Sequence, residues 1–170
     1  MKKERGFTLI ELMVTLAIAA ILLTVGVPSM RDLVLNNRLV AATNTFTSTL
    51  NIVRSEAIKQ GRNASLCVSS DQAKCTGETD WHLGWIAWVD LNGNSVLDAG
   101  EILRIVEPFP NNITVTPSVA VSSFRIDATG SVNNPNVRLT LCDDRTGEIG
   151  RQVRIMATGG VSLNSQFACS

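Results

Sequence analysis

A single carboxylate interrupts the one membrane-length apolar segment of this chain. Glu11 lies within a run of 22 residues from Phe7 to Pro28, directly after a short leader that carries three basic residues. As a helix rising about 1.5 Å per residue, this run would span roughly the 30 Å of a bilayer core. Because the basic residues all precede it, the leader should stay in the cytoplasm and the C-terminal part should be exported.

Glu11 needs a partner in such an environment. A carboxylate inside a membrane helix costs about 2.5–3.5 kcal/mol at the centre of the helix and less near the interface. No basic residue follows Glu11 until Arg31. If the chain were cut between Gly6 and Phe7, however, the new α-amino group would lie four residues before Glu11, one helical turn away. We therefore predict that cleavage supplies the missing cation.

The start of the chain resembles a known type of leader. The junction of Gly6 and Phe7, the stretch 8–11 and Pro28 resemble the class III signal peptide of type IV pilins and type II secretion pseudopilins. This resemblance implies that a prepilin peptidase cleaves after Gly6 and that an N-methyltransferase modifies Phe7. It also implies that Glu11, as the fifth mature residue, helps to place each subunit in a growing fibre.

Two other interpretations remain open for this segment. An ordinary secretory signal would be cleaved at a small-residue site such as 17–19 or 25–27, but it would leave Glu11 in its apolar core unexplained. An uncleaved anchor would let the side chain of Glu11 reach toward the interface.

The remaining chain fits one compact domain carried on a long helix. About 110 of the 170 residues follow the helical part, which is enough for one hydrophobic core. Removing residues 1–6 takes away three basic residues and one acidic residue, which leaves 12 against 14 and a net charge of −2. A chain with this balance has no global basic field that would recruit nucleic acid.

The four cysteines are even in number and all lie in the part expected to be exported, where an oxidising periplasm would pair them. Of the three connectivities we favour Cys67–Cys75, which closes a short loop, and Cys142–Cys169, which ties the C-terminus to a strand. A zinc site is the alternative, but it normally uses closer Cys-x-x-Cys spacing and further ligands that this chain lacks.

The first 60 residues read as one long helix in two halves. Pro28 cannot donate a backbone hydrogen bond, so the helix should kink there and then resume. A transmembrane half would cover residues 7–28 and an amphipathic half residues 29–60, with Gly61 as the C-cap. Apolar residues in the second half recur at intervals of three and four, and they predict a face that packs on a domain: Leu35, Leu39, Ala42, Phe46, Leu50, Val53 and Ala57.

Beyond Gly61 the apolar period changes to two and turn residues become frequent. This pattern predicts a β-rich domain over residues 61–170. The expected strands are 64–69, 84–90, 101–107, 113–117, 123–127, 137–142 and 152–157.

A second diagnostic stretch contains three tryptophans. Residues 81–90 place a Gly-Trp pair before alternating apolar residues, and an Asp-x-Asn-x-Asn run follows. This pattern resembles the GspH/FimT branch of minor pilins and pseudopilins. The resemblance implies a pilin-like α+β fold, in which a C-terminal domain of two β-sheets packs beside the long kinked helix. The alternative reading of Trp81, Trp85 and Trp88 is ordinary core packing.

The loop after this stretch has the spacing of a calcium site. Oxygen ligands fall at positions 1, 3, 5, 9 and 12 of a twelve-residue segment, with a carbonyl at position 7: Asp90, Asn92, Asn94, Val96, Asp98 and Glu101. Two departures weaken the match, because Ser95 replaces the glycine expected at position 6 and strands rather than helices flank the segment. The alternative is a polar turn whose side chains cap their own backbone.

Arginines near the C-terminus are candidates for DNA binding. Arg151 and Arg154 could present guanidinium groups to phosphates. Some FimT-like minor pilins bind DNA through a C-terminal Gly-Arg-x-Arg element, but here the two arginines are one residue too far apart and acidic residues lie nearby. DNA uptake is therefore an alternative and not the main prediction.

No residue pattern in the sequence indicates a catalytic site. The sole histidine, His82, lies beside Trp81 without the signature of a nucleophile, and the glycines form no phosphate-binding loop. We predict a subunit that is not an enzyme but a substrate of prepilin peptidase and methyltransferase. It would need no cofactor unless calcium fills the 90–101 loop.

Taken together, these patterns favour a minor pilin that assembles into or primes a type IV pilus. The alternatives are a GspH-type minor pseudopilin of type II secretion and a DNA-binding minor pilin for natural transformation. The expected partners are other minor and major pilins or pseudopilins, the inner-membrane assembly platform and, in the last case, DNA. The chain would cross the bacterial inner membrane once, with its β domain in the periplasm, before it enters a pilus or pseudopilus.

Overall fold

The computed structural model describes residues 7–110 and 112–169, without the side chains of Pro28 and Glu148. The predicted leader, residues 1–6, lies outside the described residues. The chain divides into two compact units between Asn37 and Arg38, and each is considered by itself.

The first unit is a helix whose regular hydrogen bonding is interrupted once. It contains α1 (Leu9–Ile21), the π-helical segment η1 (Leu22–Gly26) and the start of α2 (Val27–Gln60). The interruption ends two residues before Pro28, whose nitrogen has no proton to donate to the preceding turn. Pro28 itself lies within α2, and the irregular turn precedes it; the kink at Pro28 stays a prediction.

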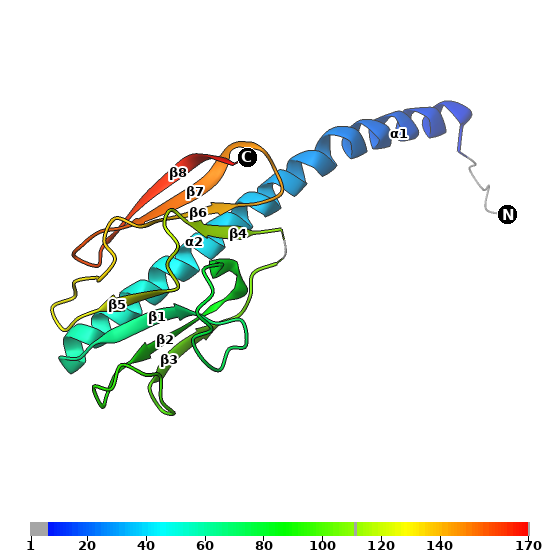
Figure 1. Cartoon of the computed structure of the whole chain (residues 1–170). Coiled ribbons are helices and arrows are strands. Elements are labelled where there is room, and N and C mark those ends of the chain that lie inside the picture. The colour runs from blue at the N-terminus through cyan, green and yellow to red at the C-terminus, as the bar shows by residue number, and fades with distance from the viewer. Residues whose placement is uncertain (1–6, 111, 170) are drawn as a thin grey trace. The chain divides into compact units, whose positions relative to one another are not determined.

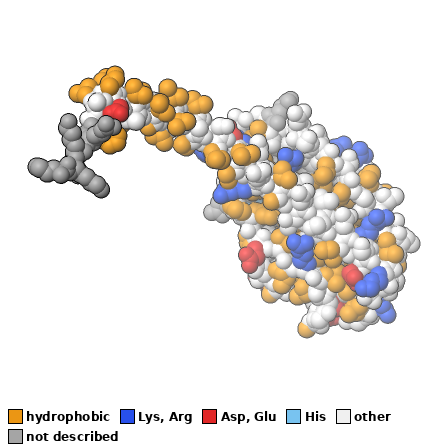
Figure 2. All heavy atoms as spheres, turned by 180° about the vertical axis from the view of Figure 1, so that it is seen from behind, with side chains coloured by type: hydrophobic (Ala, Val, Ile, Leu, Met, Phe, Trp, Pro, Cys, Tyr) orange, Lys and Arg blue, Asp and Glu red, His pale blue; other side chains and the backbone are white. Residues whose placement is uncertain are grey.

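The first unit also carries the apolar surface that the sequence predicts. No residue of α1 is buried, and apolar side chains cover the visible surface of the N-terminal helix (Figure 2). Among the described residues, one helix is long and apolar enough to cross a membrane, running from Leu9 to Gln60 with a mean hydropathy of 2.4 in its most apolar window. The finding rests on length and composition.

In the second unit, α2 from Arg38 onward packs on the β domain along its predicted face. The buried residues of this face recur every three or four positions: Leu39, Ala42, Phe46, Leu50, Val53 and Ala57. The helix ends at Gln60. Gly61 follows with a φ of 62°, and the N–H of Arg62 donates to the carbonyl of Ala57 at 3.1 Å, so the last turn is closed by a left-handed glycine.

The β domain consists of two four-stranded antiparallel sheets. Their strand orders are β3-β2-β1-β5 and β4-β6-β7-β8, and both sheets lie along α2 (Figure 1). The strands are β1 (Ala64–Val68), β2 (Trp85–Val89), β3 (Ile102–Val106), β4 (Thr114–Pro117), β5 (Ser123–Ile126), β6 (Arg138–Cys142), β7 (Gly147–Ile155) and β8 (Val161–Cys169).

Seven of the eight strands were expected from the sequence, and one was not. The expected strand 152–157 is the second half of a longer β7, which begins at Gly147. The following β8 was missed. Residues 161–164 alternate between apolar and polar side chains, but Ser165 and Ala168 break the alternation in the second half of the strand.

A cluster of aromatic rings fills the core between α2 and the sheets. The rings of Phe46 and Trp81 lie 5.7 Å apart, and those of Phe46 and Trp85 lie 5.6 Å apart, both edge to face. The buried Nε1 of Trp81 donates to the carbonyl of Val121 at 2.9 Å. Trp88 is also buried, but in a small cluster with Cys67 and Ile86 on the other face of its sheet. Core packing thus accounts for all three tryptophans.

Candidate functional site

The carboxylate of Glu11 closes the first turn of α1. Its Oε2 accepts hydrogen bonds from the backbone N–H and from the hydroxyl of Thr8, each at 2.9 Å. Thr8 Oγ1 in turn accepts from the N–H of Glu11 at 3.3 Å. This reciprocal arrangement is a capping box, which satisfies N–H groups that a helix start leaves open. The carboxylate is therefore held at the N-terminal end of the helix.

Thr8 is a capping residue that the sequence analysis did not single out. The spacing Thr-x-x-Glu before an apolar run is itself the signature of a capping box, so the signal was present. Gly6 lies outside the described residues, whereas the side chain of Phe7 is described and is 90% exposed.

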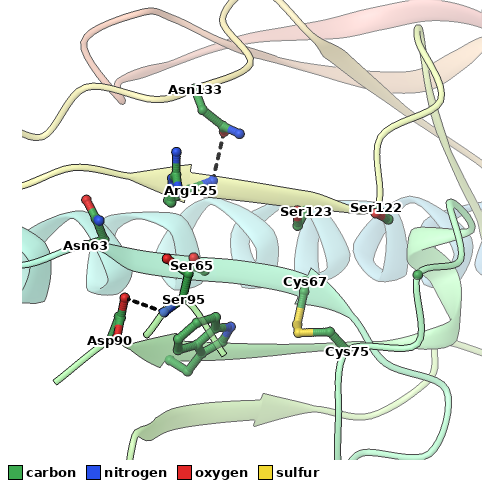
Figure 3. A pocket seen from close by; sticks show the side chains of 12 residues that line it. Asn63, Ser65, Cys67, Cys75, Asp90, Ser95, Ser122, Ser123, Arg125 and Asn133 are labelled. Carbon is green, nitrogen blue, oxygen red and sulfur yellow. Dashed lines mark hydrogen bonds between the residues drawn. A yellow bond between two sulfur atoms is a disulfide. The ribbon is translucent and has the colours of Figure 1, made fainter. Parts of the chain in front are cut away.

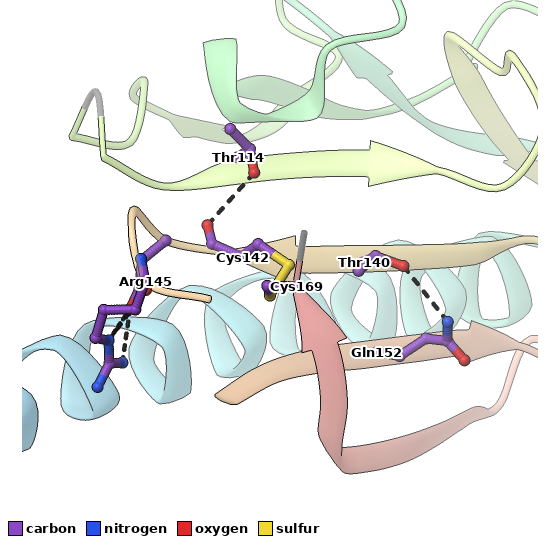
Figure 4. Close-up of a disulfide and its surroundings, with 7 residues drawn as sticks. Thr114, Thr140, Cys142, Arg145, Gln152 and Cys169 are labelled. Atoms are coloured by element: carbon purple, nitrogen blue, oxygen red, sulfur yellow. Dashed lines mark hydrogen bonds and ion pairs between the residues drawn. A yellow bond between two sulfur atoms is a disulfide. The ribbon is translucent and has the colours of Figure 1, made fainter. Parts of the chain in front are cut away.

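Both predicted disulfides are formed. Cys67–Cys75 closes a loop beside β1, and Cys142–Cys169 joins β6 to the end of β8 (Figure 4). Gly150 lies against the second bridge, where an added Cβ would come within 2.5 Å of the Cys169 sulfur. The bridge therefore fixes the last strand of the chain and requires a glycine on the neighbouring strand.

A polar pocket of about 480 Å³ lies beside the first disulfide (Figure 3). Ser65, Trp88 and Arg125 contribute to its lining, from the face of β1, β2 and β5 opposite the main core. The Nε1 of Trp88 is buried and has no hydrogen-bond partner among the described residues. The lining contains neither a histidine nor a free cysteine.

The loop predicted to bind calcium directs its oxygens at its own N–H groups. Asp90 accepts from the N–H of Gly93 at 2.7 Å and from that of Ser95 at 3.0 Å. Glu101 accepts from the N–H of Leu91 at 2.8 Å and from that of Asp98 at 3.1 Å. Both carboxylates are thus occupied by backbone donors, as in the self-capping turn that the sequence also allowed.

The remaining predicted ligands behave in the same way. The Oδ1 of Asn92 accepts from the N–H of Asn94, and the Oδ1 of Asn94 accepts from that of Val96. Their amide groups donate to Asp98 at 2.7 Å and thereby lower the pKa of Asp98. Among the described residues, no three His, Cys, Asp or Glu side chains gather as a metal site. Calcium binding stays a prediction, and an ion would have to displace these donors.

The two arginines predicted to contact DNA lie on opposite faces of β7. Arg154 is exposed and stands opposite Arg138 on β6, and its Nη2 donates to the Oδ1 of Asn136 at 2.7 Å. Arg151 stands opposite Leu141, a core residue, and its buried Nε has no hydrogen-bond partner in the part of the chain that the structure describes. Since strand side chains alternate between faces, these two arginines do not form one phosphate-binding patch.

Two family comparisons match different parts of the chain. Residues 42–159 match the family described as type II transport protein GspH. Residues 1–27 match the prokaryotic N-terminal methylation motif. A search of curated protein sequences gave no significant match.

Solved structures with a similar fold include two crystal forms of the type IV minor pilin FimU from Pseudomonas aeruginosa strain PAO1. The first is 25% identical, with a TM-score of 0.62, and the match covers 79% of this chain and 94% of FimU. The second is also 25% identical, with a TM-score of 0.60 and coverage of 76% and 96%. The minor pseudopilin EpsH from the type 2 secretion system of Vibrio cholerae is 12% identical, with a TM-score of 0.50 and coverage of 74% and 94%, so it supports the fold alone.

Proposed function

This chain belongs to the family of the type II transport protein GspH, and from that premise we propose that it is a minor pilin which assembles into or primes a type IV pilus. It is a structural subunit and a substrate of processing enzymes, not an enzyme itself. The observation that carries the proposal is the conjunction of the N-terminal methylation motif at residues 1–27 with a FimU-like domain.

The apolar helix makes the subunit a membrane-anchored protein. We place it in the bacterial inner membrane, with the β domain in the periplasm, because the basic leader precedes the helix. Prepilin peptidase would cleave after Gly6 and a methyltransferase would modify Phe7. Because no residue of α1 is buried, this helix is suited to storage in lipid until neighbouring helices replace the lipid contacts.

Assembly would join subunits through parallel N-terminal helices. Small side chains on the apolar helix, such as Ala17, Ala20 and Gly26, allow close approach of neighbouring helices. Glu11, oriented by Thr8, would meet the amine of Phe7 from its own chain or from an adjacent one, and pairing lowers the cost of both charges in lipid. The partners would be other minor and major pilins and the inner-membrane assembly platform.

The choice of a pilus over a secretion machine rests on sequence likeness. FimU is 25% identical in sequence to this chain, and the match covers 79% of this chain, whereas the sequence identity to EpsH is 12%. A GspH-type minor pseudopilin of type II secretion is the alternative. Deleting the gene in its own host separates the two: we expect loss of surface pili with normal export of secreted proteins. Lost protein export with normal pili would assign the chain to secretion.

Mass spectrometry tests the processing that the proposal requires. The mature chain isolated from host membranes should begin at methylated Phe7, and Gly6→Val should leave a heavier, unprocessed precursor. A mature chain that begins elsewhere would contradict the proposal.

DNA binding is a second candidate function, and the observation that bears on it is the exposed pair Arg138 and Arg154. Two arginines neutralise about two phosphates, which gives weak binding with a shallow salt dependence at most. A gel shift with the domain from Arg38 onward should therefore show no binding. Binding lost in Arg138→Ala/Arg154→Ala, but kept in Arg151→Ala, would establish this second function.

A further inference from the structure

A row of three residues crosses the first sheet on the face opposite the main core. Ser65 on β1 stands opposite Trp88 on β2 and also opposite Arg125 on β5. The chain neighbours of Ser65, Ala64 and Leu66, belong to the main core. Because strand side chains alternate between faces, the row lies on the other face, where all three residues line the polar pocket of about 480 Å³ (Figure 3).

Two residues of this row have polar groups that the domain does not use. Ser65 is only 7% exposed, yet its hydroxyl makes no hydrogen bond within the described part of the chain. The exposed guanidinium of Arg125 likewise has no hydrogen bond or ion pair to a described residue. A buried polar group normally has a partner, because leaving it unpaired costs free energy. The hydroxyl of Ser65 is therefore a group that a ligand in the pocket can satisfy.

A disulfide and several hydrogen bonds fix the walls of the pocket. The Cys67–Cys75 bridge holds the loop that follows β1. The Oδ2 of Asp90 accepts from the N–H of Ser95 at 3.0 Å. Asn133 accepts from the N–H of Arg125 at 2.8 Å through its Oδ1 and donates its own N–H to the carbonyl of Arg125 at 3.0 Å. A site whose walls are fixed before binding loses less conformational entropy when the ligand enters.

The charges of the lining fit a ligand that carries one carboxylate. Among the described lining residues, Arg125 is the one cation and Asp90 the one anion. The carboxylate of Asp90 already accepts two backbone N–H groups, at 2.7 and 3.0 Å. A guanidinium can donate two parallel hydrogen bonds to one carboxylate. A single arginine beside an acidic residue suits this monoanion better than a strand of nucleic acid, whose phosphates require several cations.

The uncharged lining residues favour a ligand with several hydroxyl groups. Serine hydroxyls and asparagine amides can both donate and accept hydrogen bonds, which matches the hydroxyl groups of a sugar. The lining contains four serines and two asparagines: Asn63, Ser65, Ser95, Ser122, Ser123 and Asn133. The volume of the pocket also falls in the range of about 300–1,000 Å³ that is usual for small-molecule sites.

We propose that this pocket binds an acidic sugar, such as a uronic acid residue of a polysaccharide. The guanidinium of Arg125 would hold the carboxylate of the sugar, and Ser65 with the other serine and asparagine side chains would bond its hydroxyl groups. The binding itself does not depend on the proposed function in assembly. If the chain is a pilus subunit, the pocket would attach the fibre to an acidic polysaccharide.

Two sugars that differ only in the carboxylate test the site on the wild-type protein. The full-length chain in detergent would be titrated with methyl glucuronide and with methyl glucoside, while the backbone amide signals of Ser65 and Arg125 are followed by NMR. We expect the glucuronide to shift both signals with a dissociation constant on the order of 1 mM, which is typical of so small a ligand. The glucoside should bind about tenfold more weakly or less, because it lacks the charge-assisted hydrogen bonds.

Two arginines in different sheets provide a matched pair of variants. Arg125→Gln should weaken glucuronide binding about tenfold or more, whereas Arg138→Gln, a change of an exposed arginine in the second sheet, should leave it unchanged. Ser65→Ala should weaken binding about threefold to tenfold, the usual effect of one neutral hydrogen bond. Because Arg125 is exposed, its replacement should not change the melting temperature, which a thermal scan would check.

The inference is overturned if the wild type does not bind the glucuronide, if both sugars bind equally, or if Arg125→Gln binds as tightly as the wild type. Inorganic phosphate that binds as tightly as the glucuronide would show a general anion site instead. A short glutamate-containing peptide that binds more tightly would assign the pocket to a protein chain, and either result would reject the sugar. All these measurements use the isolated subunit, so their failure would leave the proposed role in the pilus standing.

Discussion

The two units of this molecule solve the problem of apolar surface in opposite ways. No residue of α1 is buried, so its apolar side chains are available to contact lipid or other helices. The β domain buries its apolar side chains in one main core between α2 and both sheets, and two disulfides lock it. The difference teaches that the packed core and the disulfides, which stabilise the fold, lie in the second unit, whereas the first unit carries the exposed apolar surface. Variants should therefore separate into two classes.

The largest effect on stability should come from the aromatic core. Trp85→Ala removes a fully buried ring that contacts Phe46 and Phe109, and we expect a loss of about 3–5 kcal/mol in the free energy of unfolding. Urea denaturation of the domain from Arg38 onward would measure this loss. Ile105→Ala is the matched control, because Ile105 is 43% exposed. An equal loss in both variants would contradict the assigned core.

Removal of a disulfide should cause the second-largest loss in the free energy of unfolding. The loss should be larger for the disulfide that closes the longer loop. Removing Cys142–Cys169, with a separation of 27 residues, should cost about 2–4 kcal/mol. Removing Cys67–Cys75, with a separation of 8, should cost about 1 kcal/mol less on chain entropy. Paired Cys→Ser variants compared by thermal unfolding would check this order. The reverse order would show that the short loop supports more of the domain than loop closure explains.

A smaller loss of stability should appear at acidic pH, where Asp127 becomes protonated. The Thr129 hydroxyl, at 2.6 Å, and the N–H of Ser131 donate to Asp127 and lower the pKa of Asp127. Because the folded pKa lies below the unfolded value of about 3.9, the stabilisation is present above that value and is lost as pH falls through the folded pKa. Asp127→Asn should flatten part of the acid limb of a melting-temperature profile. An unchanged limb would show that the turn contributes nothing through this carboxylate.

Calcium should have the smallest effect on the melting temperature. The oxygens of the 90–101 loop already accept backbone N–H groups, so we expect equal melting temperatures in calcium and in chelator. A rise with calcium that disappears in Asp98→Asn would show that the ion displaces those donors and would establish the site.

The helix and most strands could be predicted from the sequence, because each buries one face and its apolar residues therefore recur with the period of that element. β8 was not predicted, since Ser165 and Ala168 interrupt its apolar alternation and its two ends are fixed by pairing with β7 and by the bridge at Cys169. The grouping of Arg151 with Arg154 overlooked that residues three apart in a strand point to opposite faces. The capping role of Thr8 follows from its spacing to Glu11, which is the Thr-x-x-Glu pattern of a capping box.

The most direct test of the account compares Glu11→Ala with the wild type in the host that makes the pilus. The variant should be processed, should reach the same membrane level and should show an unchanged melting temperature of the β domain, yet it should be absent from sheared pili. Incorporation of Glu11→Ala at the wild-type level would contradict the claim that a carboxylate held at the helix start places this subunit in the fibre.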